Sequence, residues 1–565
     1  MRARPLLALS GLWAAGLLIA LWVRPLWPVD ETRYLAVAWE MWQRGDFLVP
    51  YLNGAPYSHK PPLLFWLMHL GWSLFGVNEW WPRLVPPLFA LANLFLIARL
   101  ARRLWPERAD IAALAPWIAF GGLLWTAFST VAMFDMLMVF FALTGMLGLV
   151  EAWRGNALRG WALLAVAIGL GVLAKGPVIL LHTLPAALLA PWWAQGRTGE
   201  PRPHWRHWYG GVLAAILIGA LIALSWALAA GQAGGPVYRD AIFWGQTADR
   251  MSESFAHRQP WWWYAALLPL ILFPWLFWPP LWRALGRLRA QLADPGARFV
   301  LAWLVPVFVA FSLISGKQPQ YLLPLFAAFA LFLARALSAN EITVRRGDLG
   351  VPGAVIVLLG AILAFLPFVP ESRLPSLPAG LSFLPGLFVA LAGLALVVPR
   401  APDIPRQVQR LTAASAVLLA VAHLGILRAA APAHDLAPLG AYLQQLQQDG
   451  RALAHLGKYH GQYQFVGRLR APLAVVIGPA QLKDWVERHP GGKVVAYADA
   501  LPPGVAAVPD YEQPFRSGKA AVWDGARLAE ILEEGEPGRF WSPAPQDSLA
   551  VTWSATPRPG STRSS

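Results

Sequence analysis

The stretch "MRARPLLALSGLWAAGLLIALWV" (residues 1–23) places an apolar run of about twenty residues behind two arginines. A helix of roughly 20 apolar residues is long enough to cross the ~30 Å hydrocarbon core of a bilayer. The run resembles a secretory signal, but no cleavage site of small residues follows it, so we expect it to remain as a first membrane span. This stretch therefore predicts a membrane protein.

The rest of the chain repeats this pattern. Its 565 residues are 57% hydrophobic and only 14% charged, and the mean hydropathy is +0.46. A surface that faces water needs more charge than this. We therefore predict a polytopic α-helical membrane protein with about thirteen transmembrane helices, over residues 5–23, 83–101, 109–128, 134–153, 160–175, 177–193, 209–230, 263–283, 298–315, 320–337, 350–370, 380–398 and 410–428.

The basic residues predict how the chain is oriented. A formal net charge of +15 could indicate nucleic-acid binding, but the Lys and Arg lie mainly in short segments between apolar runs. Basic loops mark the cytoplasmic side of a membrane protein, and these alternate onto one side: residues 99–110, 153–160, 196–208, 286–291, 344–348 and 399–410. The outer side then receives residues 24–82, the neighbourhood of Asp135, residues 231–260 and 315–320, and the chain after 429. Without Cys, disulfides and thiolate metal sites are excluded.

The first outer loop and the C-terminal part have structure of their own. Apolar residues at helical spacing predict one helix over residues 34–45 and a second over 60–76, both on the outer membrane surface. Short strand-like segments at 473–478, 493–499 and 520–525, with helical segments between them, predict a small α/β domain outside the membrane. We divide the chain into a transmembrane domain (1–428), a periplasmic α/β domain (429–550) and a disordered tail (551–565).

The segment "PVDETRY" (28–34) leaves the first span with two adjacent carboxylates. Asp30 could cap the next helix and pair with Arg33 or Tyr34 one turn on. Alternatively, a carboxylate at the membrane boundary could act as a general base toward an acceptor hydroxyl or phosphate. In "YSHKPPLL" (57–64), Lys60 either extends toward lipid headgroups or holds a lipid phosphate.

Two further charges interrupt apolar segments. Asp135 begins a span, and ionisable groups at such depth usually have partners; Lys60 is a plausible partner if the two segments meet. Lys175, in "LAKGP", marks a turn on the outer side, with phosphate contact as the alternative.

Two later outer segments add cations and a phenol. Arg258 follows His257 just before a Trp-rich membrane entry, and Arg can bind phosphate through two hydrogen bonds. Lys317 and Tyr321 lie one turn apart in "SGKQPQYLLPL" (315–325). His59 and His257 together could supply two ligands to Zn²⁺, with substrate or water completing the shell. Because all these signals fall on the outer side, we interpret them as parts of one site.

These motifs resemble those of a known enzyme family. The segment "DETRYLAVAWEMWQRGDFLVPYLNGAPYSHKPPLLFW" (30–66) is similar to the first outer loop of the bacterial polyprenyl-phosphate-sugar glycosyltransferases. These comprise the aminoarabinose transferases of lipid A and the related protein-mannosyltransferase-like superfamily with the GT-C fold. Asp135, "LAKGP", the segment 250–275 and "SGKQPQYLLP" extend the likeness over most of residues 1–340.

The resemblance implies a transfer reaction on the periplasmic face of the bacterial inner membrane. A sugar on a polyprenyl-phosphate donor moves to a membrane-lipid or envelope-glycan acceptor, most simply a lipid A-like glycolipid. Asp30 is then the catalytic base, and Asp135 orients the cationic side chains. The lipid phosphate is held by Lys60, Arg258, Lys317 and Tyr321, which supply fixed charge where negative charge develops.

One position departs from the family pattern. The aminoarabinose transferases usually carry Glu before the Lys of the K-P-P motif, where this chain has His59. In the family that Glu and the later His look like metal ligands, so a Zn²⁺ site built from His59 and His257 would be an altered one.

Three other functions are alternatives to transfer to a lipid. One is a protein O-mannosyltransferase-like activity. Another is a lipid or sugar transporter or flippase, which usually has internal repeats and charges near the membrane midplane. The third is a non-catalytic envelope-assembly component. Charges at one membrane face, with Asp30 and Lys60 intact, favour the enzyme.

Overall fold

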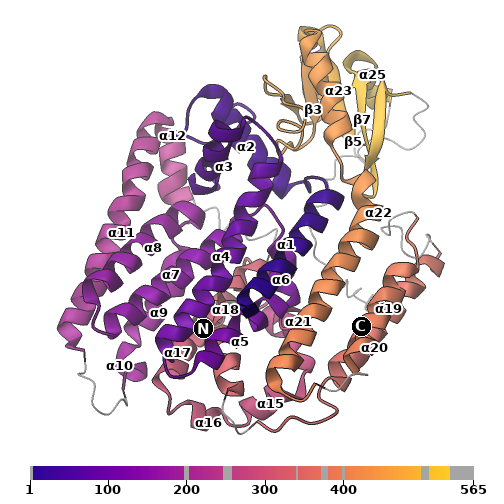
Figure 1. The fold of residues 1–565 in the computed structure, drawn as a ribbon. Coiled ribbons are helices and arrows are strands. Elements are labelled where there is room, and N and C mark those ends of the chain that lie inside the picture. The colour runs from indigo at the N-terminus through magenta and orange to yellow at the C-terminus, as the bar shows by residue number, and fades with distance from the viewer. Residues whose placement is uncertain are drawn as a thin grey trace, which may run out of the picture.

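The computed structural model describes residues 4–195, 203–245, 258–338, 342–370, 380–397, 401–497 and 508–534. A bundle of helices carries a smaller part with a β-sheet at one end (Figure 1). Within the described residues, nine helical segments are long and apolar enough to cross a membrane, which confirms a multi-pass membrane protein. They contain α1 (Arg4–Val23), α4 (Trp80–Leu104), α7 (Asp135–Trp153), α8 (Ala157–Lys175), α11 (Trp205–Ala233), α17 (Pro295–Leu313), α18 (Leu323–Leu337), α19 (Gly350–Phe365) and α21 (Ile404–Val421).

Several predicted spans are shorter or broken in the structure. Three of them contain the shorter apolar helices α5 (Ala109–Gly121), α9 (Val178–Leu188) and α20 (Leu384–Val397). The predicted span 263–283 is divided into α14 (Trp263–Ile271), a 3₁₀ turn (Trp275–Phe277) and α15 (Pro279–Leu285). Pro274 follows α14 and cannot donate a helical hydrogen bond, and Pro279 suits the first turn of a new helix. Proline therefore ended helices that hydropathy alone predicted to continue.

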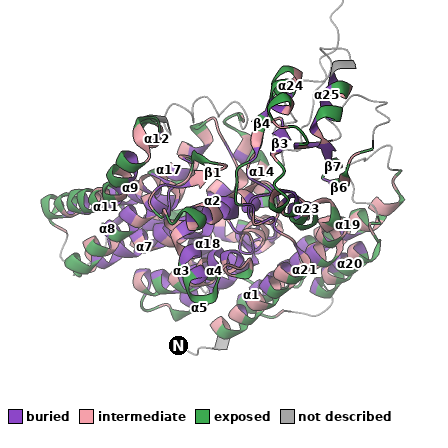
Figure 2. Ribbon diagram, turned by 90° about the horizontal axis from the view of Figure 1, so that it is seen from above, coloured by how far each residue is buried: buried purple, intermediate pink, exposed green. Residues whose placement is uncertain are grey.

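Burial separates the interior helices from the lipid-facing ones. The apolar windows of α7 and α18 are 78% and 83% buried, whereas those of α11 and α19 are only 22% buried. Figure 2 shows the same contrast, with the centre of the bundle buried and α11, α19 and α20 exposed at its edges. Because α11 and α19 are apolar on all sides, their exposed faces suit hydrocarbon rather than water.

The first outer loop forms the two predicted helices. Helix α2 (Asp30–Arg44) begins four residues before the predicted start and ends at Gly45, whose φ of 65° places it in the left-handed region that favours glycine. A hairpin of β1 (Tyr51–Leu52) and β2 (Ala55–Pro56) turns through Asn53 and Gly54. Helix α3 (Leu63–Phe75) then follows Pro62. The short helices elsewhere are α6 (Leu123–Phe128), α10 (Ala190–Trp193), α12 (Gly235–Asp240), α16 (Leu288–Gln291) and α22 (Arg428–Ala430).

The C-terminal part is built on a five-stranded mixed sheet in the order β4-β3-β5-β7-β6. Its strands are β3 (Leu453–Leu456), β4 (Ala474–Val476), β5 (Lys493–Tyr497), β6 (Tyr511–Phe515) and β7 (Gly518–Asp524). Strand β3 is parallel to β4 and β5, and β7 is antiparallel to β5 and β6. One face packs on α23 (Ala437–Gln448), and the other packs on α24 (Pro479–Arg488) and α25 (Gly525–Glu534). Alternate strand residues therefore enter two separate apolar cores.

The sheet part is attached to the first outer loop by side-chain hydrogen bonds. The Asn53 amide donates to the carbonyl of Leu473 at 2.9 Å, and its oxygen accepts from the Leu473 N–H at 2.8 Å and from Gln464 at 2.9 Å. The Trp39 indole donates to the carbonyl of Leu469 at 3.0 Å. The segment 464–473 is thereby held against α2 and the hairpin.

Candidate active site

The two adjacent carboxylates of α2 have different environments. Asp30 is the first residue of the helix, and its side chain is 46% exposed. Its carboxylate accepts from the Arg33 guanidinium and from the Tyr34 hydroxyl at 3.3 Å, while the helix cap is Val29 rather than Asp30. Asp30 is therefore an accessible, oriented carboxylate, as a proton acceptor must be.

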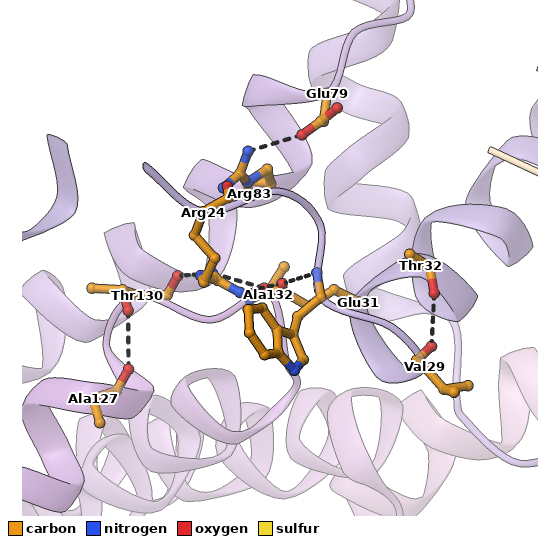
Figure 3. A network of polar contacts seen from close by, with 10 residues as sticks. Arg24, Val29, Glu31, Thr32, Glu79, Arg83, Ala127, Thr130 and Ala132 are labelled. Atoms are coloured by element: carbon orange, nitrogen blue, oxygen red, sulfur yellow. Dashed lines mark hydrogen bonds and ion pairs between the residues drawn. The ribbon is translucent and has the colours of Figure 1, made fainter. Parts of the chain in front are cut away.

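Glu31 is buried and belongs to the framework beneath the site (Figure 3). Its carboxylate forms an ion pair with Arg24 and accepts from the backbone N–H of Trp27 at 2.8 Å and of Ala132 at 2.7 Å. Arg24 also donates to the carbonyl of Thr130 at 2.9 Å. This network ties the start of α2 to the turn before α7, so it fixes Asp30 relative to Asp135.

Asp135 and Lys175 form the buried ion pair of the site. Asp135 is the first residue of α7 and is 4% exposed, and its carboxylate contacts the ammonium of Lys175, the last residue of α8. The same ammonium lies 4.8 Å from the ring centroid of Tyr321. The ion-pair partner of Asp135 is thus Lys175 and not Lys60, because the close packing of α7 against α8 brings the start of α7 to the end of α8.

Lys60 lies beside the Asp135–Lys175 pair but forms no ion pair with Asp135. Its ammonium is 5.8 Å from the ring centroid of Phe134, and it has no hydrogen bond or ion pair with any residue that the structure describes. Burial away from water, followed by repulsion from Lys175, lowers the pKa of Lys60 to about 8, while the nearby Asp135 and Asp30 act in the opposite direction. A half-buried ammonium without a bonded partner can accept a phosphate oxygen from a ligand.

Arg258 and Lys317 lie in two later segments of the chain that contact each other. Arg258 forms an antiparallel bridge with Gly316. Lys317 is only 3% exposed and donates to the carbonyls of Gln259 at 2.8 Å and Ile314 at 2.5 Å. In this conformation Lys317 joins the two segments, and its part in phosphate binding stays a prediction. Tyr321 lies in the 3₁₀ helix Pro319–Leu322 directly after this junction.

The proposed zinc ligands are not brought together by the described residues. His59 is exposed and its ring centroid lies 5.3 Å from that of Tyr57, while His257 lies outside the described residues. No group of three or more His, Asp or Glu in the described part of the chain is placed to hold a metal ion. Zinc therefore gains no support.

The structure brings five residues from five parts of the chain into one cluster: Asp30, Lys60, Asp135, Lys175 and Tyr321. Four of them are predicted from the sequence as site residues, whereas Lys175, beside the helix-ending Gly176, is predicted to mark a turn, with phosphate contact as the alternative. Arg24 is not among the predicted site residues, although an arginine at the end of an apolar span is a signal for a buried partner. An exposed carboxylate beside fixed cations is suited to deprotonating an acceptor and to stabilising a leaving phosphate.

Comparisons with known proteins agree with this geometry. Residues 59–226 match the family model described as dolichyl-phosphate-mannose-protein mannosyltransferase. The chain is 32% identical over 403 residues to undecaprenyl phosphate-α-4-amino-4-deoxy-L-arabinose arabinosyl transferase 2 of Pseudomonas fluorescens, covering 68% of this chain and 69% of that protein. A namesake from Erwinia tasmaniensis is 30% identical, with 69% and 72% covered, and one from an Enterobacter species is 32% identical, with 62% of each covered.

A solved structure supports the same fold. The crystal structure of ArnT from Cupriavidus metallidurans bound to undecaprenyl phosphate superposes with a TM-score of 0.69 at 19% identity, over 92% of this chain and 97% of that one. The apo form gives the same score at 20% identity.

Fold and site together define a membrane glycosyltransferase with the GT-C fold. More narrowly, the chain belongs to the family of the undecaprenyl phosphate-α-4-amino-4-deoxy-L-arabinose arabinosyl transferases. The resemblance in the sequence motifs is confirmed, and the transporter or flippase alternative is set aside.

Proposed function

We propose that this enzyme transfers a sugar from an undecaprenyl-phosphate carrier to a glycolipid acceptor on the periplasmic face of the bacterial inner membrane. The observation that carries the proposal is Lys60, an ammonium without a bonded partner beside the Asp135–Lys175 pair and Asp30. The names of the relatives favour 4-amino-4-deoxy-L-arabinose as the sugar and undecaprenyl phosphate as its carrier. Lipid A is the acceptor we propose.

The proposed chemical step uses the residues of the cluster. The Asp30 carboxylate takes the proton from the acceptor O–H as the acceptor oxygen bonds to the anomeric carbon. The bond from that carbon to the phosphate oxygen breaks, and its electron pair leaves with the polyprenyl phosphate. Lys60, Arg258, Lys317 and Tyr321 stabilise the charge on the departing phosphate. Asp135 holds Lys175 in place.

We also propose the orientation in the membrane. About thirteen segments cross the bilayer, and the cluster and the α/β domain after residue 428 both face the periplasm. The two apolar cores of the sheet part, separate from that of the bundle, support a domain boundary near α22. The bonds of Asn53 to segment 464–473 support a common side for the first outer loop and the sheet. The predicted tail, 551–565, lies outside the described residues.

Transfer to a protein acceptor is the second candidate function. The match of residues 59–226 to the mannosyltransferase model favours it. The two functions differ in the acceptor, so one assay separates them.

The test is sugar transfer in vitro by the purified full-length chain in lipid nanodiscs. Undecaprenyl-phosphate donors carrying aminoarabinose, mannose or galactose are offered with lipid A or with an unfolded protein acceptor. We expect transfer of aminoarabinose to lipid A. Transfer of mannose to protein would favour the second candidate, and transfer from none of the donors would refute both.

Asp30→Asn tests the base within the same assay. Removing a general base slows a reaction by about 10²- to 10⁴-fold, so we expect a loss of that size. Asp110→Asn is the control, because Asp110 lies in the first turn of α5 and pairs with Arg108 away from the cluster. If Asp30→Asn folds normally and keeps its activity, the assigned base is wrong.

A further inference from the structure

The sheet part contains a cavity that the transfer step does not use. Its volume is about 770 Å³, within the usual range for small-ligand sites. It lies between the end of α23, the segment 468–474 and the end of α24. In Figure 1, α23 and β3 stand at the end of the molecule near which α2 and α3 also lie.

The lining of the cavity is strongly basic. It includes Arg451, Arg468, Arg470 and His489, and none of the described residues that line it is acidic. Arg451 and Arg470 are exposed, and their guanidinium groups have no hydrogen bond or ion pair with any residue that the structure describes. Two arginines that pair with no described residue therefore line one cavity, which suits a phosphate.

The cavity also offers groups that suit a sugar. The side-chain amides of Gln444 and Gln448 line it and make no hydrogen bond with a described residue. Gln447 is used internally, since its amide donates to the carbonyl of Ala471 at 2.9 Å and accepts from the Arg470 N–H at 3.1 Å. The His489 ring is stacked on Trp485, with centroids 4.9 Å apart. Amides and flat rings are the groups that contact sugar hydroxyls and sugar faces.

The wall of this cavity is joined to the active-site loop. Arg468 lies 3.7 Å from the ring centroid of Phe465 and 5.7 Å from that of Trp39 in α2, the helix that begins with Asp30. The same wall is bonded to Asn53, seven residues before Lys60 in the chain. A molecule in the cavity would therefore lie against the segment 468–474, which is bonded to the loop between Asp30 and Lys60.

We infer that this cavity binds the phosphorylated saccharide of the acceptor. The two free guanidinium groups of Arg451 and Arg470 take the phosphate, and the glutamine amides take hydroxyl groups. The inference rests on the proposed function, because it assigns to the glycolipid acceptor a second contact away from the reacting atoms. The cavity is then a specificity site for acceptors that carry phosphate.

Binding to the full-length protein in nanodiscs tests the inference without any chemistry. Lactose 1-phosphate, lactose and inorganic phosphate are titrated calorimetrically into the wild type and into the double variant Arg451→Gln, Arg470→Gln. We expect lactose 1-phosphate to bind most tightly and the double variant to bind it at least about tenfold more weakly. The matched control is Arg488→Gln, because Arg488 is an exposed arginine of α24 that pairs with Asp484 and does not line the cavity.

Each other outcome overturns the inference. If lactose bound as tightly as lactose 1-phosphate, the phosphate would have no role in binding. If inorganic phosphate bound as tightly as lactose 1-phosphate, the cavity would hold an adventitious ion only. Unchanged binding by the double variant would place the ligand elsewhere, and no binding by the wild type would exclude the site.

Transfer kinetics link the cavity to the acceptor and separate it from the proposed function. In the double variant the KM for the phosphorylated glycolipid should rise about tenfold, while kcat and the KM for the donor stay unchanged. If kcat falls and the acceptor KM does not rise, the arginines are not acceptor contacts. Failure of Asp30→Asn to lose activity would instead refute the proposed function and leave the lactose 1-phosphate titration unaffected.

Discussion

Replacing Lys60 with methionine removes the ammonium that has no bonded partner in the cluster while keeping most of the side-chain volume. A charge-assisted hydrogen bond to a phosphate oxygen contributes about 1.5–3 kcal/mol. Its loss should lower kcat/KM for the polyprenyl-phosphate donor by about 10- to 150-fold at pH 7. The fold should survive, because Lys60 has no hydrogen bond or ion pair to a described residue.

The lowered pKa of Lys60 gives this prediction a pH signature. Only the protonated amine attracts the phosphate, and the pKa of about 8 means that this form is lost as the pH rises through 8. At pH 9 about one-tenth of the free enzyme keeps the charge, so kcat/KM for the donor should fall by about tenfold for each further pH unit. A bound phosphate favours the charged amine, so the corresponding limb of kcat should lie at higher pH.

Lys60→Arg provides the matched control, because a guanidinium stays charged throughout this range. Its pH profile, measured with the same donor and acceptor from pH 6 to 10, should lack the alkaline limb near 8. If Lys60→Met keeps its activity within twofold, Lys60 does not bind the phosphate. If Lys60→Arg retains the limb, another group titrates there.

Three further substitutions test the framework of the site. Lys175→Met leaves Asp135 buried without its ion-pair partner, which should destabilise the fold by about 3–5 kcal/mol. The double variant Lys175→Met, Asp135→Leu should recover much of this lost stability in thermal unfolding. Equal unfolding temperatures for Lys175→Met and the wild type would contradict the prediction. Glu31→Gln removes the charge from the buried network and should lower the unfolding temperature, with a smaller loss for Glu40→Gln, because the Glu40 side chain is less buried and its partner Arg44 is exposed. Activity loss at unchanged stability would instead indicate a direct catalytic role for Glu31. Asn53→Ala removes three hydrogen bonds to segment 464–473, so the backbone amides of that segment should exchange their hydrogens faster. Unchanged exchange would show that the Asn53 hydrogen bonds do not hold this segment against the first outer loop.

Much of the site could be predicted from the sequence because charged residues are rare within and beside apolar segments. Asp30 and Asp135 interrupt or border apolar spans, where charge is expensive and therefore informative. Lys60 precedes two prolines that start a helix, so its place just before that helix was predictable. The side of the membrane on which these residues were placed followed from the loop charges, and it stays a prediction.

The pairing of charges could not be read in the same way. Lys60 and Lys175 are equivalent as lysines, and only the packing of α7 on α8 assigns Lys175 to Asp135 and leaves Lys60 without a bonded partner. Likewise Asp30 and Glu31 are adjacent carboxylates, and the turn of the chain alone decides that Glu31 points inward to Arg24. The choice for Glu31 also depends on a contact between distant segments, because its carboxylate accepts from the backbone N–H of Ala132, 101 residues later.

By itself, the sequence determined the membrane class, the two helices of the first outer loop and the residue types of the site, because hydropathy, helix spacing and isolated charges are local properties. Only the tertiary structure decided where helices break, which lysine is free and how segment 464–473 meets Asn53. These depend on burial and on contacts across the chain, because an ion pair or a hydrogen bond forms only where the folded backbone brings both partners within a few ångströms.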